Sequence, residues 1–376
     1  MSSDERQARE SIERTSEGRR AVSLDAIVMA GDREASRPVK GSNKALLEIH
    51  GIPLVGYVVS ALERSRYVSR IFVVGPKKEI TEALEKRPRQ AETQKPVLVV
   101  EQWNTLVENA WNTFLETLKE GQGPEPLPDE RTLRARYKDK VALVVGADIP
   151  LLTPYEVDEF IEGSDLERYD FLLGMTPREA LEPYYPTKDR PGIKLAYFAL
   201  KDSLERQNNL HLVRFFAVGN RDYVEKMYRH RYQRRWKNIV RLAWTILRIP
   251  EMRPWMVLSF LLLHLARILE GLGLSRLRAM VARFLDRRRL EEAVSQILKT
   301  RFASVRTHYG GAALDVDNEE HLRCIEANFD LWQRFQQERY EARRKGEAQG
   351  SRRPIGGSLE GESNRLGQCE VARRQP

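Results

Sequence analysis

Short apolar runs alternate with helix-like patterns through the first half of the chain. The apolar runs predict buried strands at 26–30, 71–75, 97–100 and 141–147. Apolar residues spaced three or four positions apart predict helices between these strands, at about 54–64, 78–86 and 105–119. This alternation is typical of a parallel sheet with helices on both faces. The pattern therefore predicts an α/β fold with a mostly parallel, Rossmann-like sheet.

In the second half of the chain, the strand pattern gives way to a basic, apolar stretch and then returns. Further strands are predicted at 171–175, 194–200 and 303–307, and the stretch 121–130, rich in Pro and Gly, predicts a surface loop. We expect one domain formed by 23–222 and 301–345, interrupted by a basic, apolar helical insertion at 223–300. The ends, 1–22 and 346–376, have no apolar face and are predicted to be disordered tails.

Residues 228–285 combine arginines with aromatic and aliphatic side chains. The apolar run that starts at Trp255 stops at His264 and Arg267, so it is shorter than the about 20 residues of a membrane-spanning helix. Two interpretations stay open. One is a helical insertion whose apolar faces pack against each other. The other is peripheral membrane contact, with Trp236, Trp244 and Trp255 as interfacial anchors and the arginines facing anionic lipid.

Composition indicates which partners and which cell compartment to expect. The chain has 376 residues, a formal net charge of +9 and a pI near 9.5, which favours anionic partners. Nucleic acid is not expected, because the arginines of 228–285 accompany strongly apolar positions. Cys324 and Cys369 lie far apart and predict neither a disulfide framework nor a zinc site. With no apolar signal-peptide region in the first 22 residues, we expect a cytoplasmic protein, with attachment to the inner face of the membrane as the open alternative.

Candidate chemistry gathers where the predicted strands end. The strand 26–30 is followed by Gly31 and a loop with Arg33, Arg37 and Lys44, and such a loop can wrap a polyphosphate. Asp148 ends the strand that begins at Val141 and is expected at the same sheet edge, where open α/β sheets bind ligands. A carboxylate there suits Mg²⁺. Next in sequence, Thr153, Pro154 and Glu156 predict a helix start with a capping box.

Several of these segments resemble one family. Ala30-Gly31, Asn43–Leu47, Gly51–Leu54 and Asp148-Ile149-Pro150 are similar to motifs of the nucleotidyltransferases related to molybdenum cofactor guanylyltransferase, which have a glycosyltransferase-A-like fold. The resemblance covers roughly 24–215 and 303–325. It departs from the family pattern at Asp32, where a second glycine is usual.

The resemblance implies a role for particular residues. It makes Lys44 and Asp148 catalytic, and it assigns Asp148, with Asp315 or Asp317, to the metal. The nucleotide would be bound by Ala30, Gly31, Arg33, Arg37, Lys44, Asn104, Thr105 and Asn109, and the acceptor by Gln207, Asn208 and Asn209. Local alternatives remain for some of them: Asn104 or Thr105 as a helix cap, Asp317 or Asn318 as a helix cap, and the three amides as an ordinary turn. Gly310-Gly311 would let the backbone approach a ligand.

The resemblance further implies a Mg²⁺-dependent nucleotidyltransferase. Such an enzyme transfers a nucleoside monophosphate from a nucleoside triphosphate to a phosphorylated small-molecule acceptor and releases pyrophosphate. Two alternatives remain open from the residues: a glycosyltransferase that uses a nucleotide-sugar donor, and an inactive relative that binds a membrane or a partner through 223–300.

Overall fold

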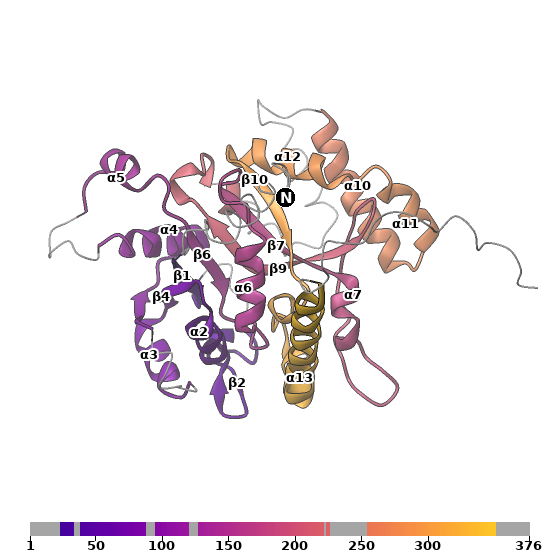
Figure 1. Ribbon diagram of the computed structural model, residues 1–376, viewed down its shortest axis with the longest axis horizontal. Helices are drawn as coiled ribbons and strands as arrows, with labels where there is room; N and C mark the ends of the chain where they lie inside the picture. The colour runs from indigo at the N-terminus through magenta and orange to yellow at the C-terminus, as the bar shows by residue number, and fades with distance from the viewer. Residues whose placement is uncertain are drawn as a thin grey trace, which may run out of the picture.

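The fold is built on one mixed sheet. The computed structural model describes residues 23–33, 38–87, 95–119, 127–221, 223–225 and 254–350. The sheet has eight strands, seven of them in the order β10-β7-β9-β6-β1-β4-β5, with β8 paired to β9 (Figure 1). Their bounds are β1 Leu24–Met29, β4 Val68–Gly75, β5 Val97–Glu101, β6 Ala142–Gly146, β7 Phe171–Pro177, β8 Phe198–Ala199, β9 Leu204–Val213 and β10 Phe302–Arg306.

Alternating side chains of the central strand divide the core between the two faces of the sheet. Ala26 and Val28 of β1 pack in one cluster with α2 (Leu54–Arg64) and α6 (Pro154–Glu162). Ile27 points to the other face. There it packs with Phe114 of α4 (Leu106–Glu116), whose ring stacks on Phe215 with 4.6 Å between centroids. The predicted two-sided, mostly parallel sheet is confirmed.

Most predicted elements are confirmed within two or three residues. Helix α2 has the predicted bounds, and α3 spans Lys77–Glu85. Beyond the predicted loop at 121–130, the structure adds a helix, α5 (Glu130–Tyr137), capped by Asp129. The predicted strand 194–200 is reduced to the two residues of β8. A small hairpin of β2 (Glu48–Ile49) and β3 (Ile52–Pro53) leads into α2, with left-handed backbone at Gly51, whose φ is 75°.

Strand β9 corrects the prediction for the amide-rich segment. It runs antiparallel to β6, β7 and β8, whereas the other strand pairs described in this sheet are parallel. The consecutive amides Gln207, Asn208 and Asn209 therefore lie inside a ten-residue strand and not in a turn. Pairing with β7 shifts register between Leu173 and Met175, beside these amides. Because β9 is antiparallel to β6, its first half lies toward the end of β6.

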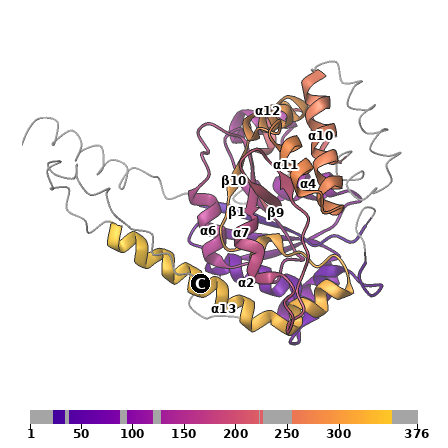
Figure 2. The same cartoon turned by 90° about the vertical axis from the view of Figure 1, so that its right-hand side faces the viewer.

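In the part of the chain that the structure describes, α-helices lie between β9 and β10, and another follows β10. Between them lie α10 (Pro254–Gly271), α11 (Ser275–Ala282) and α12 (Arg287–Leu298), and after β10 comes the long α13 (Glu319–Gly350). In Figure 1, α10 and α11 lie at the upper right of the molecule, and α13 lies at the bottom; both views place α13 below α10 and α11 (Figures 1 and 2). Trp236 and Trp244 lie outside the described residues. Among the helices that are described, none is long and apolar enough to cross a lipid bilayer.

Candidate active site

Asn43 fixes the position of the predicted catalytic lysine. Its amide nitrogen donates to the carbonyl of Ala30, just past β1, at 2.9 Å, and its amide oxygen accepts from the Ala45 backbone N–H at 3.0 Å. The second bond caps the short 3₁₀ helix Lys44–Leu46. The loop is thus tied back to the end of the central strand. As a result Lys44 points across the sheet edge.

Three segments far apart in the sequence meet at Lys44. Its ammonium Nζ lies 3.4 Å from Oδ2 of Asp148 and 3.0 Å from Oδ1 of Asp317. The lysine side chain is 11% exposed, and the two carboxylates are 23% and 34% exposed. The backbone joins the same segments, because the Val316 N–H donates to the Asp148 carbonyl at 2.9 Å. The cluster is therefore partly shielded but still open to a ligand.

The two candidate aspartates of the last segment have different partners. Asp315 accepts a hydrogen bond from Arg206 of β9 at 2.7 Å, whereas Asp317 faces Lys44. The helix cap belongs to Asn318, whose Oδ1 accepts from the His321 N–H at 2.9 Å. Because Asn318 caps α13, the Asp317 carboxylate remains available at the cluster. Asp317 is the better placed of the two to share a ligand with Asp148.

Burial and crowding of charge set the protonation of this cluster. Burial raises the pKa of Asp148 to about 6; Lys44 opposes the shift, and Asp315 and Asp317 add to it. Burial also disfavours ionised Asp315, but the charge and hydrogen bond of Arg206 outweigh it and lower the pKa of that carboxyl. When all of these groups are ionised, the cluster has three carboxylates and two cations, Lys44 and Arg206, and so carries a net negative charge.

The loop after β1 packs against the end of β5 and the start of α4. A Cβ on Gly31 would lie 2.8 Å from Nδ2 of Asn109, so a larger residue there would displace the Asn109 side chain. Asp32 exchanges two hydrogen bonds with Gln102: its N–H donates to Oε1 at 2.9 Å, and its Oδ1 accepts from Nε2 at 2.7 Å. Arg33 donates to the Gln102 carbonyl at 3.2 Å. The predicted residue Arg37 lies outside the described residues.

These features agree with the comparison to known sequences. Residues 26–236 match the MobA-like NTP transferase domain, which is more than half of the chain. The chain belongs to the MobA-like NTP transferase family. It is accordingly an enzyme of the transferase class, of the nucleotidyltransferase type. No protein of curated function is a significant match in sequence.

Solved structures similar to this transferase include three other proteins. A hypothetical transferase from Thermus thermophilus has 22% identity and a TM-score of 0.46, over 80% of this chain and 100% of that one. The 4-diphosphocytidyl-2C-methyl-D-erythritol synthase of Anaerococcus prevotii has 12% identity and a TM-score of 0.38, over 83% and 100%. A CMP:2-keto-3-deoxy-manno-octonic acid synthetase complexed with CTP has 14% identity and a TM-score of 0.38, over 82% and 99%.

At the start of α4, the structure supports a local role for one predicted nucleotide-binding residue of the transferase. The Thr105 hydroxyl accepts from the Glu108 N–H at 3.1 Å, and the Glu108 carboxylate accepts from the Thr105 N–H at 3.0 Å. This is a complete capping box. Asn104 is exposed beside it, and Asn109 is buried below Gly31. Gln102, which the sequence analysis did not single out, joins Asn109 under the loop.

The three amides of β9 do not form one acceptor-binding group. Asn208 is 1% exposed and donates to the hydroxyls of Thr176 and Thr307 at 3.2 and 3.0 Å. It belongs to the core, so its predicted acceptor role is corrected: a buried amide with these partners cannot turn to a ligand. Gln207 is exposed. Asn209 packs beside Gly146 near Asp148 and donates to the Ala312 carbonyl at 3.2 Å.

Glu156 is a positioning residue that the sequence pattern misassigned. Thr153 does cap α6, accepting from the Glu156 N–H at 3.4 Å. The Glu156 carboxylate, however, accepts from the backbone N–H groups of Gly310 and Ala312 and from the Thr307 hydroxyl, at 3.2, 2.9 and 3.1 Å. Burial raises its pKa to about 7. Glu156 thus fixes the turn that leads to Asp315 and Asp317.

The glycine pair in this turn serves packing. A Cβ on Gly311 would lie 2.1 Å from the Leu151 carbonyl oxygen, and Gly310 has a φ of 98° beside Tyr184. The prediction that Gly310-Gly311 approaches a ligand is therefore corrected: the pair approaches the protein's own backbone. Its close contact brings the last segment against the end of β6.

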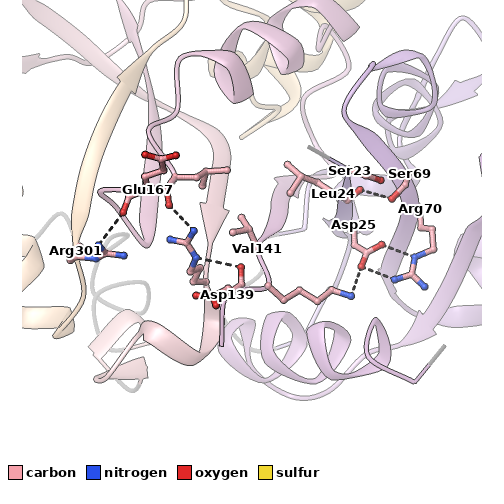
Figure 3. Close-up of a pocket in the computed structure, with 12 residues that line it drawn as sticks. Ser23, Leu24, Asp25, Ser69, Arg70, Asp139, Val141, Glu167 and Arg301 are labelled. Atoms are coloured by element: carbon pink, nitrogen blue, oxygen red, sulfur yellow. Dashed lines mark hydrogen bonds and ion pairs between the residues drawn. The ribbon is translucent and has the colours of Figure 1, made fainter. Parts of the chain in front are cut away.

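A second cleft, of about 760 Å³, lies at the opposite edge of the sheet, where β1 and β6 begin (Figure 3). Its charged groups are paired with one another: Arg70 donates two hydrogen bonds to Asp25, at 2.6 and 2.7 Å, and Lys140 lies 2.8 Å from the same carboxylate. Arg301 is likewise bound to Asp170. Because ligands of open α/β sheets bind at the carboxyl ends of the strands, the cluster around Lys44 is the candidate active site of the transferase, and this cleft is not.

Proposed function

We propose that this transferase joins a nucleoside monophosphate, taken from a nucleoside triphosphate, to a phosphorylated small-molecule acceptor. An acceptor phosphate oxygen attacks the α-phosphorus and forms a new P–O bond. The bond between the α-phosphorus and the bridging oxygen breaks, and its electron pair leaves with pyrophosphate. The observation that carries the proposal is the convergence of Asp148 and Asp317 on the ammonium of Lys44, at 3.4 and 3.0 Å.

The chain's own residues contribute positioning and charge. Lys44, held by the Asn43 cap at the end of β1, is placed to bind a phosphate oxygen of the triphosphate. The loop around Gly31 would bring Arg33, whose side chain is 47% exposed, to the same ligand. Because this chemistry transfers a phosphoryl group between oxygens, a fixed array of charges accounts for catalysis without a protein nucleophile.

The acidic side chains fit a magnesium ion. Mg²⁺ in proteins takes one or two carboxylates and completes its coordination with water and phosphate oxygens. Asp148 and Asp317 supply two partly exposed carboxylates; burial is the main cause of the raised pKa of Asp148, and the neighbouring charges of Asp315 and Asp317 add to it. Among the described residues, no set of three His, Cys, Asp or Glu side chains is grouped as a metal site. When bound, Mg²⁺ would neutralise charge that develops on the phosphates.

The acceptor would approach from the side of β9. Asn209 lies next to Gly146 and Asp148, and Gln207 is exposed on the same strand. Arg206, although paired with Asp315, is also on β9 near the cluster. These residues offer amide and cationic groups to a phosphate ester. We propose that Gln207 and Asn209 bind the acceptor and that Asn208 supports the strand.

The experiment is a substrate panel scored by pyrophosphate release. Each of the four ribonucleoside triphosphates is combined with sugar, polyol and cofactor phosphates, with and without Mg²⁺. We expect pyrophosphate from one combination, dependent on Mg²⁺ and lost in Asp148→Asn but kept in Asp165→Asn, a surface control. Nucleotide sugars are tested with the same acceptors in a parallel panel. Release of a nucleoside diphosphate there would identify a glycosyltransferase and overturn the proposal.

A further inference from the structure

Helix α10 has one face that the protein core does not cover. Leu258, Leu261, Leu265, Ile268 and Leu272 follow each other at intervals of three or four residues and are 42–66% exposed. This spacing places them on one side of the helix. The other side is buried, with Ala266 at 0% exposure in a cluster that includes Ala199 of β8. The helix is therefore anchored to the sheet and presents a second apolar stripe outward.

Helix α11, which packs against α10, also exposes apolar side chains. Leu277, Met280 and Phe284 have the same spacing and are 48%, 59% and 70% exposed. The opposite side of this helical segment packs through Ala282 and Leu285 into the cluster that holds α10. Soluble monomers seldom expose so many large apolar side chains together. We call the exposed apolar side chains of these two segments the α10–α11 face; the two helices lie at the upper right of the molecule in Figure 1.

The charges around this face are mainly positive. Residues 254–289 contain seven arginines, no lysine, and only Glu270 and Asp286 as acids. Arg267, Arg276, Arg283, Arg288 and Arg289 are exposed. A second copy of the same face would bring these charges against each other and be repelled. A surface with anionic groups next to an apolar phase would instead attract the arginines and accommodate the exposed leucines.

We propose that the α10–α11 face binds the surface of a lipid bilayer that carries anionic headgroups. The exposed side chains of Leu272, Met280 and Phe284 enter the headgroup and acyl boundary, and the arginines pair with lipid phosphates. The enzyme is held at the membrane through the end of the molecule where α10 and α11 lie, with α13 away from this contact (Figure 2). This inference does not depend on the proposed reaction.

Vesicle sedimentation of the full chain tests the proposal. We expect binding to vesicles of phosphatidylcholine mixed with an equal amount of phosphatidylglycerol, weak binding to phosphatidylcholine alone, and a decrease at high salt. The variant Met280→Asp/Phe284→Asp should lose at least about tenfold in partition coefficient. Leu98→Asp, at a residue of β5 that is 43% exposed, is the matched control and should bind like the wild type.

A second variant separates charge from packing. Arg276→Ala/Arg283→Ala leaves the apolar side chains in place and should weaken binding by about fivefold for each arginine. Arg131→Ala/Arg136→Ala, on exposed positions of α5, removes the same charge elsewhere and should have a smaller effect. The proposal is overturned if wild type binds neither vesicle, if both vesicles bind equally, or if the Asp variant still binds. It is also overturned if the wild type is a dimer that Met280→Asp/Phe284→Asp dissociates.

Discussion

The ammonium of Lys44 lies 3.0 Å from the carboxylate of Asp317, although 273 positions separate them in the chain. Lys44 follows the first strand of the sheet, and Asp317 precedes the last long helix. Asp148 completes the group from the end of β6. The fold thus brings a lysine and two acids to one sheet edge, where backbone hydrogen bonds of Lys44 and Asp148 help to hold the segments together.

Lys44→Met tests the cation of this group. The substitution keeps most of the length and the apolar part of the side chain, but it removes the charge from two carboxylates. We expect kcat/KM for pyrophosphate release to fall by about 10²–10³, the cost of losing one preorganised charge donor in an active site. Lys78→Met, on the exposed start of α3, should retain full activity. Activity of Lys44→Met within a few fold of wild type would show that Lys44 is not part of the machinery.

Asp32→Asn tests the residue that replaces the second glycine of the family pattern. Asparagine can keep both hydrogen bonds with Gln102, but it removes a negative charge from the proposed triphosphate loop. We expect the Kd for the nucleoside triphosphate to decrease by roughly fivefold, which is about 1 kcal/mol between unit charges a few ångströms apart near water. Calorimetric titration measures it. A weaker affinity in Asp32→Asn would mean that the carboxylate assists binding.

Glu156 makes stability depend on pH. Burial raises its pKa from 4.5 to about 7, so the folded state retains a proton that the unfolded state releases. Stability contributed by this group therefore falls as the pH rises from 4.5 towards 7, and then levels off. The total change is up to about 3 kcal/mol.

The matched variant for this effect is Glu156→Gln, which cannot ionise. Urea unfolding at about pH 5 and about pH 8 should show wild type losing roughly 2–3 kcal/mol more than the variant between the two values. The absolute stability of the variant is not the readout, because its amide also changes the hydrogen bonds to Gly310 and Ala312. Equal pH dependence in both proteins would contradict the raised pKa of Glu156.

Gly311→Ala tests the packing that positions Asp315 and Asp317. The added Cβ would lie 2.1 Å from the Leu151 carbonyl oxygen, and a backbone atom cannot give way as a side chain can. We expect destabilisation of about 1–3 kcal/mol in urea, together with lower activity, because the last segment must shift. Gly271→Ala, in α10 with open space around it, should be neutral or slightly stabilised. A Gly311→Ala enzyme with wild-type stability would contradict the contact.

The sequence was sufficient to predict which residues that follow apolar strands lie close together. Gly31, Lys44 and Asp148 follow such strands, and parallel strands place their carboxyl ends at one edge, so their proximity could be predicted. The amides of β9 could not be placed, because an antiparallel strand with alternating polar residues resembles a loop when its two neighbours are unknown. The role of Asn208 in the core is to donate hydrogen bonds to the hydroxyls of Thr176 and Thr307.

Long-range polar contacts could not be predicted from the sequence either. The spacing of Thr153 and Glu156 is typical of a local capping box, and the pattern contains nothing that directs the carboxylate to residues 307–312. Gln102 was missed for a similar reason, since one glutamine after a strand has no spacing signal. The exposed stripe of α10 is visible in the sequence as an apolar helix pattern, but its exposure depends on which side the sheet covers.

Binding of Mn²⁺ in place of Mg²⁺, followed by electron paramagnetic resonance with and without the productive nucleoside triphosphate, tests the active-site assignment most directly. We predict that wild type and Asp165→Asn bind the ion together with the nucleotide, and that Asp148→Asn and Asp317→Asn both lose this binding while keeping their melting temperatures. If Asp148→Asn binds Mn²⁺ and nucleotide as tightly as wild type, the carboxylates around Lys44 do not form the metal site.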